Sequence, residues 1–118
     1  MRIVIIDDDR EHLSCLLECL GGAGYETAGY ENGATAIADI GRNGADLVIT
    51  DIFMPGMDGF EVLRHLQGAA PSLPVIAIDR APPGDRSFLE IIKRMGAADA
   101  IRPVDCAALI AVVKRTLS

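Results

Sequence analysis

No hydrophobic run in this sequence is long enough to cross a membrane. Half of the 118 residues are hydrophobic, but the apolar runs stop well before the roughly 20 residues that a membrane-spanning helix requires. The chain also passes directly from Met1 into the pattern of a strand, with none of the features of a secretion signal. These absences predict a soluble, cytoplasmic protein that has no membrane partner.

Basic residues are scarce relative to acidic ones. The chain has 11 Lys and Arg residues against 17 Asp and Glu residues, which gives a formal net charge of −6. Binding to a phosphate backbone requires a basic face, so this balance argues against direct contact with nucleic acid. An acidic chain is better suited to a metal site and to protein partners.

Cysteine is also rare, and its spacing does not indicate a metal site. The three cysteines are Cys15, Cys19 and Cys106, and no two of them form a CxxC pair. His12, Cys15 and Cys19 share one face of a predicted helix and could in principle hold a soft metal. We favour the simpler interpretation, in which they are partly buried beside the leucines of that helix, and we expect no zinc.

The length of the chain indicates one domain over residues 1–118. A domain of this size buries about two thirds of its unfolded surface on folding. We therefore expect a hydrophobic core that needs neither a disulfide nor a structural metal.

Strand and helix patterns alternate along the whole chain, and glycine or proline separates them. Strands are predicted over residues 2–6, 25–30, 46–50, 74–78 and 98–101. Helices are predicted over residues 10–20, 34–40 and 86–95, around residues 60–66, and from an N-cap at Asp105 to residue 117. A loop is predicted at Pro82, Pro83 and Gly84. This alternation predicts an α/β fold in which helices cover both faces of a doubly wound parallel sheet.

Charged side chains follow four of the predicted strands. They are Asp7 and Asp8 after the first strand, Asp51 after the third, Asp79 after the fourth and Arg102 after the fifth. Ligands of open parallel sheets bind beyond the carboxyl ends of the strands, so we expect these side chains to meet at one edge. Carboxylates about 4 Å apart repel each other by roughly 4 kcal/mol at an effective dielectric constant of 20 and need a cation to stay ionised. The pattern predicts a site for Mg²⁺ or a similar ion that prefers oxygen ligands.

Residues 51–59 carry the most specific motif, in which an apolar strand delivers Asp51 into a turn rich in proline and glycine. Three shorter motifs support it: residues 5–9, residues 96–99 and the pair Arg102-Pro103. Together these motifs resemble the receiver domain of two-component response regulators, and the resemblance covers essentially the whole chain. It implies a flavodoxin-like (βα)5 fold with the strand order 2-1-3-4-5.

The resemblance also implies a role for each acidic residue. Asp51 would be the phosphoacceptor and would receive a phosphoryl group from a histidine kinase or a histidine phosphotransfer protein. Asp7, Asp8 and Asp51 would bind Mg²⁺ together with the backbone carbonyl of Phe53. The domain would act as a switch that signals by conformational change, and not as an enzyme with external turnover.

By the same resemblance, the output surface would be formed by the helix over residues 86–95, the strand over residues 98–101 and the last helix. A downstream protein target, a fused output domain or a second copy in a dimer would bind there. We expect most of its apolar residues to belong to the core, namely Ile91, Ile92, Met95, Ile110 and Val113. The sequence leaves open whether the chain is a single-domain regulator or an excised N-terminal domain.

Two positions depart from the family pattern. Asp79 stands where the family has a Thr or Ser that follows the phosphoryl group, and it is followed by Arg80 where a small residue is usual. Arg102 stands before Pro103 where the family has a Lys that contacts a phosphoryl oxygen. We hypothesise that Asp79 and Arg102 form an ion pair in the resting state. Such a pair would slow the phosphorylation of Asp51 or weaken its readout.

Two other classes of protein compete with this interpretation. The first is a pseudo-receiver, a phosphorylation-independent interaction module, which Asp79 favours and the intact set of Asp7, Asp8 and Asp51 opposes. The second is a hydrolase of the haloacid dehalogenase type, because an apolar strand precedes the acidic residues 7–9. The short chain leaves no room for the cap of such a hydrolase, and the motif over residues 51–55 has no place in it.

Overall fold

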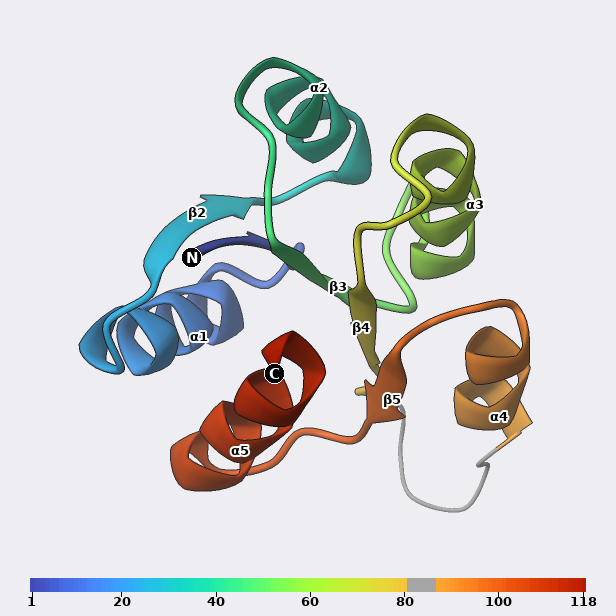
Figure 1. Cartoon of the computed structure of the whole chain (residues 1–118). Helices are drawn as coiled ribbons and strands as arrows, with labels where there is room; N and C mark the ends of the chain where they lie inside the picture. The colour runs from blue at the N-terminus through green and yellow to red at the C-terminus, as the bar shows by residue number, and fades with distance from the viewer. Residues whose placement is uncertain (81–86) are drawn as a thin grey trace.

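A parallel β-sheet forms the centre of the computed structural model, which describes residues 1–80 and 87–118 (Figure 1). Its strands are β1 (Arg2–Ile6), β2 (Glu26–Tyr30), β3 (Leu47–Asp51), β4 (Val75–Ile78) and β5 (Asp99–Ile101). They lie in the order β2-β1-β3-β4-β5, and every neighbouring pair is parallel. This arrangement confirms the flavodoxin-like fold that the sequence predicts.

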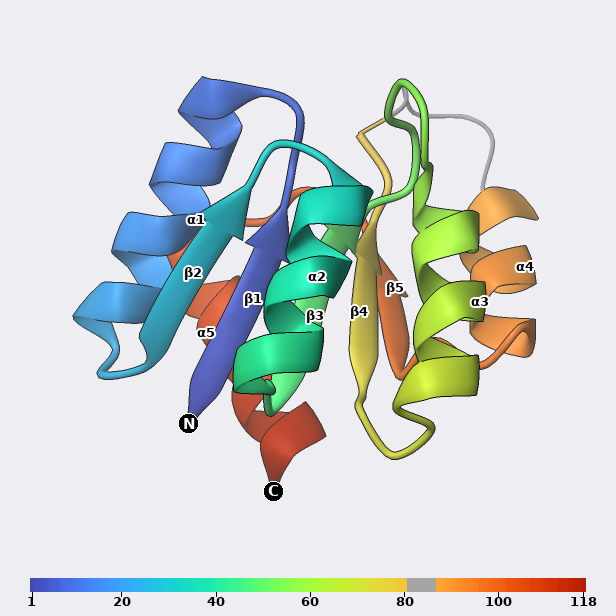
Figure 2. The same ribbon diagram turned by 90° about the horizontal axis from the view of Figure 1, so that it is seen from above.

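Helices cover both faces of the sheet (Figures 1 and 2). The helices are α1 (Arg10–Gly22), α2 (Gly33–Asn43), α3 (Gly59–Ala69), α4 (Ser87–Arg94) and α5 (Cys106–Leu117). Helices α1 and α5 pack on one face, and α2, α3 and α4 pack on the other. No helix among the described residues is both long enough and apolar enough to pass through a membrane.

The strands are apolar on both faces because both faces are covered. In β1, Ile3 and Ile5 contribute to the core beneath α1 and α5, whereas Val4 and Ile6 contribute to the core beneath α2, α3 and α4. All four side chains are at most 1% exposed. The predicted core residues Ile92 and Val113 are also buried, but Ile91 is 45% exposed.

Short polar side chains cap the first turns of four helices. Asp9, Asn32, Asp58 and Asp105 each accept hydrogen bonds from backbone N–H groups of α1, α2, α3 and α5. Asp105 accepts from the N–H of Ala108 at 2.8 Å, as the sequence predicts. These caps satisfy N–H groups that have no partner within the helix, and so they fix where each helix begins.

Two helices extend past the glycines at which the sequence predicts their ends. Helix α1 continues through Gly21 and Gly22, and α2 continues through Gly41 to Asn43. Gly44, with a φ of 71°, provides the left-handed residue that ends α2. The predicted loop at residues 82–84 and the predicted helix start at residue 86 lie outside the described residues.

The cysteines differ from the sequence prediction. Cys19 and Cys106 form a disulfide with a Cα–Cα distance of 5.7 Å, which joins α1 to the first residue of α5. Cys15 is a free thiol and is exposed, not partly buried. The sequence does not predict this pairing, because a link across 87 positions depends on how α1 and α5 pack against each other.

A buried acidic residue stabilises the packing of α2 against β1. Asp39 is 4% exposed and accepts hydrogen bonds from Arg2 Nη2 at 2.6 Å and from Asn43 Nδ2 at 2.5 Å. The Arg2 guanidinium, followed by the Asn43 amide, lowers the pKa of Asp39 to about 2. Asp39 is therefore ionised at neutral pH and joins α2 to the start of the sheet.

Candidate functional site

Three acidic side chains are buried where strands of the sheet end. Asp51 is the last residue of β3, and Asp7 and Asp79 directly follow β1 and β4. Asp51 is 4% exposed, and the other two are fully buried. The backbone N–H groups of Asp7 and Asp79 donate to the carbonyls of Tyr30 and Ile101 at 3.0 and 2.9 Å. The sheet therefore fixes the positions from which these carboxylates extend.

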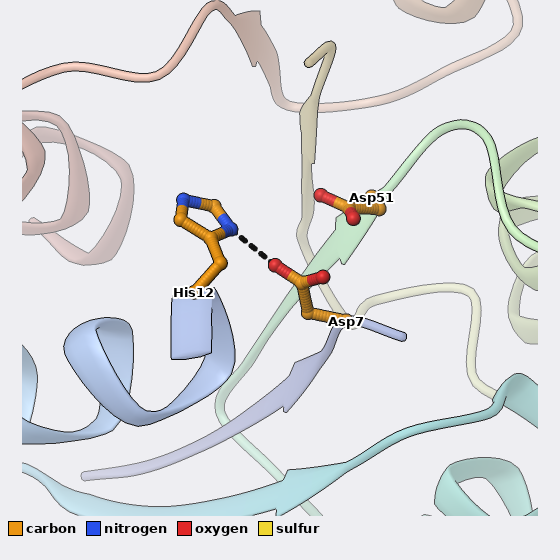
Figure 3. Close-up of side chains that lie close together, drawn as sticks. All are labelled: Asp7, His12 and Asp51. Carbon is orange, nitrogen blue, oxygen red and sulfur yellow. Dashed lines mark hydrogen bonds and ion pairs between the residues drawn. The ribbon is translucent and has the colours of Figure 1, made fainter. Parts of the chain in front are cut away.

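Asp7, His12 and Asp51 form a compact cluster at this edge of the sheet (Figure 3). One oxygen or nitrogen atom from each side chain lies within 4.8 Å of the corresponding atoms of the other two. The imidazole Nδ1 of His12 is in hydrogen-bonding contact with Oδ2 of Asp7. The sequence predicts the meeting of Asp7 and Asp51 but does not assign His12 to the site. The signal for His12 was its place in the first turn of α1, three residues after Asp9.

Arg80 brings a positive charge to the same cluster. Its Nη2 donates to Asp9 Oδ2 at 2.9 Å, and its Nη1 lies 3.4 Å from Asp7 Oδ1 and 3.7 Å from Asp51 Oδ2. From the sequence, Arg80 stands out only as a divergent position, and Arg102 is the arginine expected to pair with Asp79. The signal for Arg80 was its place immediately after β4 and Asp79, at the edge where the acids meet.

Asp51 is in an unusual electrostatic environment. Burial, followed by the hydrogen bond and the negative charge of Asp7, raises the pKa of Asp51 to about 8. Its Oδ1 is buried and has no hydrogen-bond partner within the part of the chain that the structure describes. Buried polar atoms are normally paired, so this oxygen is available to a ligand that can reach it. A cation at that oxygen would favour the ionised form of Asp51.

An open pocket of about 330 Å³ lies beside these acids and is lined by Asp8, Asp51, Phe53 and Arg80. Three of the four residues predicted to bind a metal, namely Asp8, Asp51 and Phe53, thus border one space. The fourth, Asp7, contacts Arg80. The side chain of Phe53 is 47% exposed, and its ring meets that of Phe88 of α4 edge-on, with 4.9 Å between the ring centroids.

The turn after Asp51 returns the chain into α3 and holds the end of β3 in place. Gly56 has a φ of 76°, which favours glycine. The N–H of Gly59 donates to the carbonyl of Ile52 at 2.7 Å. Asp58 then caps α3 by accepting from the N–H of Glu61 at 3.0 Å. The glycines and Asp58 of this motif therefore fix the backbone on both sides of the turn.

The remaining predicted positions lie close to the same edge. Asp79 is fully buried, Arg102 is half-buried and Pro103 is exposed. The ion pair between Asp79 and Arg102 stays a prediction. Arg80 is the arginine whose contacts with Asp7, Asp9 and Asp51 are established.

Comparisons with known proteins identify relatives of this chain. Residues 3–114 match the family described as the response regulator receiver domain. The DNA-binding transcriptional regulator NtrC of Rhizobium meliloti (strain 1021) is 33% identical over 119 residues, which cover 98% of this chain and 24% of that protein. The transcriptional regulatory protein ZraR of Klebsiella oxytoca is 36% identical over 104 residues, which cover 87% of this chain and 23% of that protein. The chain thus spans about a quarter of the length of these curated relatives.

Solved structures show the same similarity at the level of the fold. The receiver domain of NtrX from Brucella abortus aligns with a TM-score of 0.91 and 30% sequence identity, over 98% of this chain and 97% of that one. The family match extends from β1 into α5, and the alignment with this structure includes every strand that carries an acidic residue of the site. The chain belongs to the family of response regulator receiver domains.

Proposed function

We propose that Asp51 accepts a phosphoryl group from the phosphohistidine of a histidine kinase or a histidine phosphotransfer protein. One Asp51 oxygen forms a bond to phosphorus while the bond from phosphorus to the donor nitrogen breaks. The electron pair of the broken bond stays on the donor imidazole, which then takes up a proton. The observation that carries this proposal is Asp51 itself, whose buried Oδ1 is without a hydrogen-bond partner among the described residues and which lines an open pocket.

The residues around Asp51 fit a divalent cation with oxygen ligands. We infer that Asp7, Asp8, Asp51 and the backbone carbonyl of Phe53 hold Mg²⁺, because Mg²⁺ is commonly bound by a few carboxylates and retains several waters. The ion would neutralise charge on the phosphoryl oxygens. The unpartnered Asp51 oxygen and the raised pKa of that carboxyl both indicate a site that is short of positive charge.

Phosphorylation would be read as a change in conformation, and the domain would not turn over an external substrate. We propose the face of α4, β5 and α5 as the output surface. Ile91 on α4 and Val104 before α5 support this choice, because they are 45% and 48% exposed apolar side chains. The curated relatives are about four times as long as this chain. The partner at this surface would be a fused output domain, a separate protein target or a second copy of the chain. The receiver domain itself would make no contact with nucleic acid.

The direct test is incubation with a small phosphodonor and Mg²⁺, read by intact mass. The wild-type protein should gain the mass of one phosphoryl group, and Asp51→Asn should gain none. Asp58→Asn is the matched control, because it changes a nearby acid that caps α3 and does not border the pocket. A phosphoryl group found on both the wild type and Asp51→Asn would assign the modification to another residue.

A pseudo-receiver role is the second candidate, and the contact between Arg80 and the acid cluster favours it. A guanidinium 3.7 Å from Asp51 supplies positive charge without a metal. In that case the wild-type protein would remain unmodified with any phosphodonor. Backbone NMR signals of the acid cluster would also stay unchanged as Mg²⁺ is added.

A further inference from the structure

The guanidinium of Arg80 lies inside the site that the acids form. Its Nη2 donates to Asp9 Oδ2 at 2.9 Å, and its Nη1 faces Asp7 Oδ1 at 3.4 Å and Asp51 Oδ2 at 3.7 Å. The side chain is 35% exposed and lines the open pocket beside the acids. One arginine thus contacts three carboxylates from two different segments of the chain.

The backbone holds Arg80 in place for this contact. The N–H of Asp79, the preceding residue, donates to the carbonyl of Ile101 at 2.9 Å, which extends the pairing between β4 and β5. Arg80 therefore extends from the edge of the sheet at which Asp7 and Asp51 also end. A guanidinium presents its donors as a planar fork, which allows one nitrogen to stay with Asp9 while the other faces the buried acids.

The guanidinium and a divalent ion would require some of the same oxygens. Mg²⁺ binds oxygen ligands at about 2.0–2.1 Å, and at that distance it would repel a guanidinium nitrogen close to the same carboxylate. Asp51 Oδ2 faces Arg80 and belongs to the carboxyl that we propose as a metal ligand. The two cations therefore compete for one group of acids.

We propose that Arg80 is an internal cation that occupies the acid site in the resting state and thereby sets its affinity for divalent ions. The proposal rests on the proposed metal site but not on phosphorylation. Binding of Mg²⁺ would require Arg80 Nη1 to leave Asp7 and Asp51. The bond from Arg80 Nη2 to Asp9 can persist, because Asp9 does not line the pocket. Asp9 also keeps its cap on α1, since its other oxygen, Oδ1, accepts from the N–H of Glu11 at 3.0 Å.

The experiment compares Mg²⁺ binding by the wild type, Arg80→Gln and Arg10→Gln after removal of metal with EDTA. Arg10→Gln is a matched control, because Arg10 lies near the same edge and forms a 2.7 Å ion pair with Glu31 outside the acid pocket. Both variants remove one positive charge, so a general change in net charge affects them equally. Binding is read from backbone amide shifts in NMR spectra and from isothermal titration calorimetry.

Arg80→Gln should lower the Kd for Mg²⁺ on the order of tenfold relative to the wild type, and Arg10→Gln should leave it close to the wild-type value. Arg80→Lys should give an intermediate Kd, because an ammonium group has no planar fork with which to contact Asp9 and the buried acids together. The rise in Tm caused by Mg²⁺ should also be larger in Arg80→Gln. The Tm of each variant without metal shows that it is folded.

Equal Kd values for the wild type and Arg80→Gln would overturn the proposal. Absence of binding in both proteins would overturn it as well, because a feature other than Arg80 would then exclude the ion. Intact mass after incubation with a phosphodonor separates this proposal from the proposed function. Tighter Mg²⁺ binding by Arg80→Gln without phosphorylation of either protein would support the role of Arg80 and reject the role of Asp51 as phosphoacceptor.

Discussion

Gly59 lies directly against the backbone of Asp51. A methyl group on Gly59 would lie 2.5 Å from the carbonyl oxygen of Asp51 and 2.7 Å from the Cα of Ile52. Both contacts are with backbone atoms, which move only if the end of β3 moves. We expect Gly59→Ala to lower the free energy of unfolding by about 1–3 kcal/mol and to displace Asp51 from the acid cluster.

Gly68→Ala is the control for this prediction. Gly68 lies in the same helix, α3, and a methyl group there would have no neighbour within 4 Å. Alanine is favoured over glycine inside a helix, so this variant should be stabilised by about 0.5–1 kcal/mol. Urea unfolding monitored by circular dichroism measures both changes. Similar stabilities for the two variants would show that the backbone beside Asp51 can adjust.

The ion pair between Asp39 and Arg2 should make stability depend on acid pH. The pKa of Asp39 is lowered to about 2 in the folded state, so the unfolded chain binds the proton more readily. The contribution of the ionised Asp39 carboxylate to stability is complete above about pH 4 and is lost as pH falls toward 2. Asp39→Asn should therefore lower the free energy of unfolding at pH 7 but cost much less at pH 2. An equal loss at both pH values would mean that the ionised form of Asp39 is not responsible.

The disulfide between Cys19 and Cys106 should stabilise the folded chain by closing a loop of 87 positions. We expect Cys19→Ser, or reduction of the wild type, to lower the free energy of unfolding by about 2–4 kcal/mol. Cys15→Ser is the control, because Cys15 is exposed and unpaired. Thermal unfolding with and without a reductant provides the measurement. A Tm of the wild type that does not respond to the reductant would contradict the expectation.

Replacing Asp51 should stabilise the metal-free protein at alkaline pH. The pKa of Asp51 is raised to about 8 by burial and by Asp7, so the folded state binds an extra proton between about pH 4 and pH 8. The free energy of unfolding of the wild type should fall as pH rises through this range. In Asp51→Asn the amide has no proton to lose there, so the free energy of unfolding should not show this fall. In EDTA the stability of the variant relative to the wild type should rise by up to about 1.4 kcal/mol for each pH unit across this range. A difference that stays constant from pH 5 to pH 8 would exclude this cause.

The fold could be predicted from the sequence because each strand and helix carries its own local signal. The continuous apolar residues of β1 and the cap at Asp105 are examples, and both are confirmed. Helix ends were predicted less well. Gly41 looked like the end of α2, but the left-handed residue needed to end that helix is Gly44.

Contacts between distant segments could not be predicted in the same way. The meeting of Asp7 and Asp51 follows from the topology of the sheet, which the alternation of elements indicates. The contacts of Arg80 depend on the path of a long side chain, and the pairing of Cys19 with Cys106 depends on how α5 packs against α1. A sequence pattern specifies neither of these.

The edge-on contact between Phe53 and Phe88 joins the acid edge of the sheet to α4. Phe53 lies two residues after Asp51, and Phe88 lies in the first turn of α4, with 4.9 Å between the two ring centroids. Because the rings are in contact, the chain just past β3 cannot shift far without displacing Phe88 or breaking this contact. The acid edge of the sheet and α4 are therefore linked through two side chains, and this link involves no atom of residue 79.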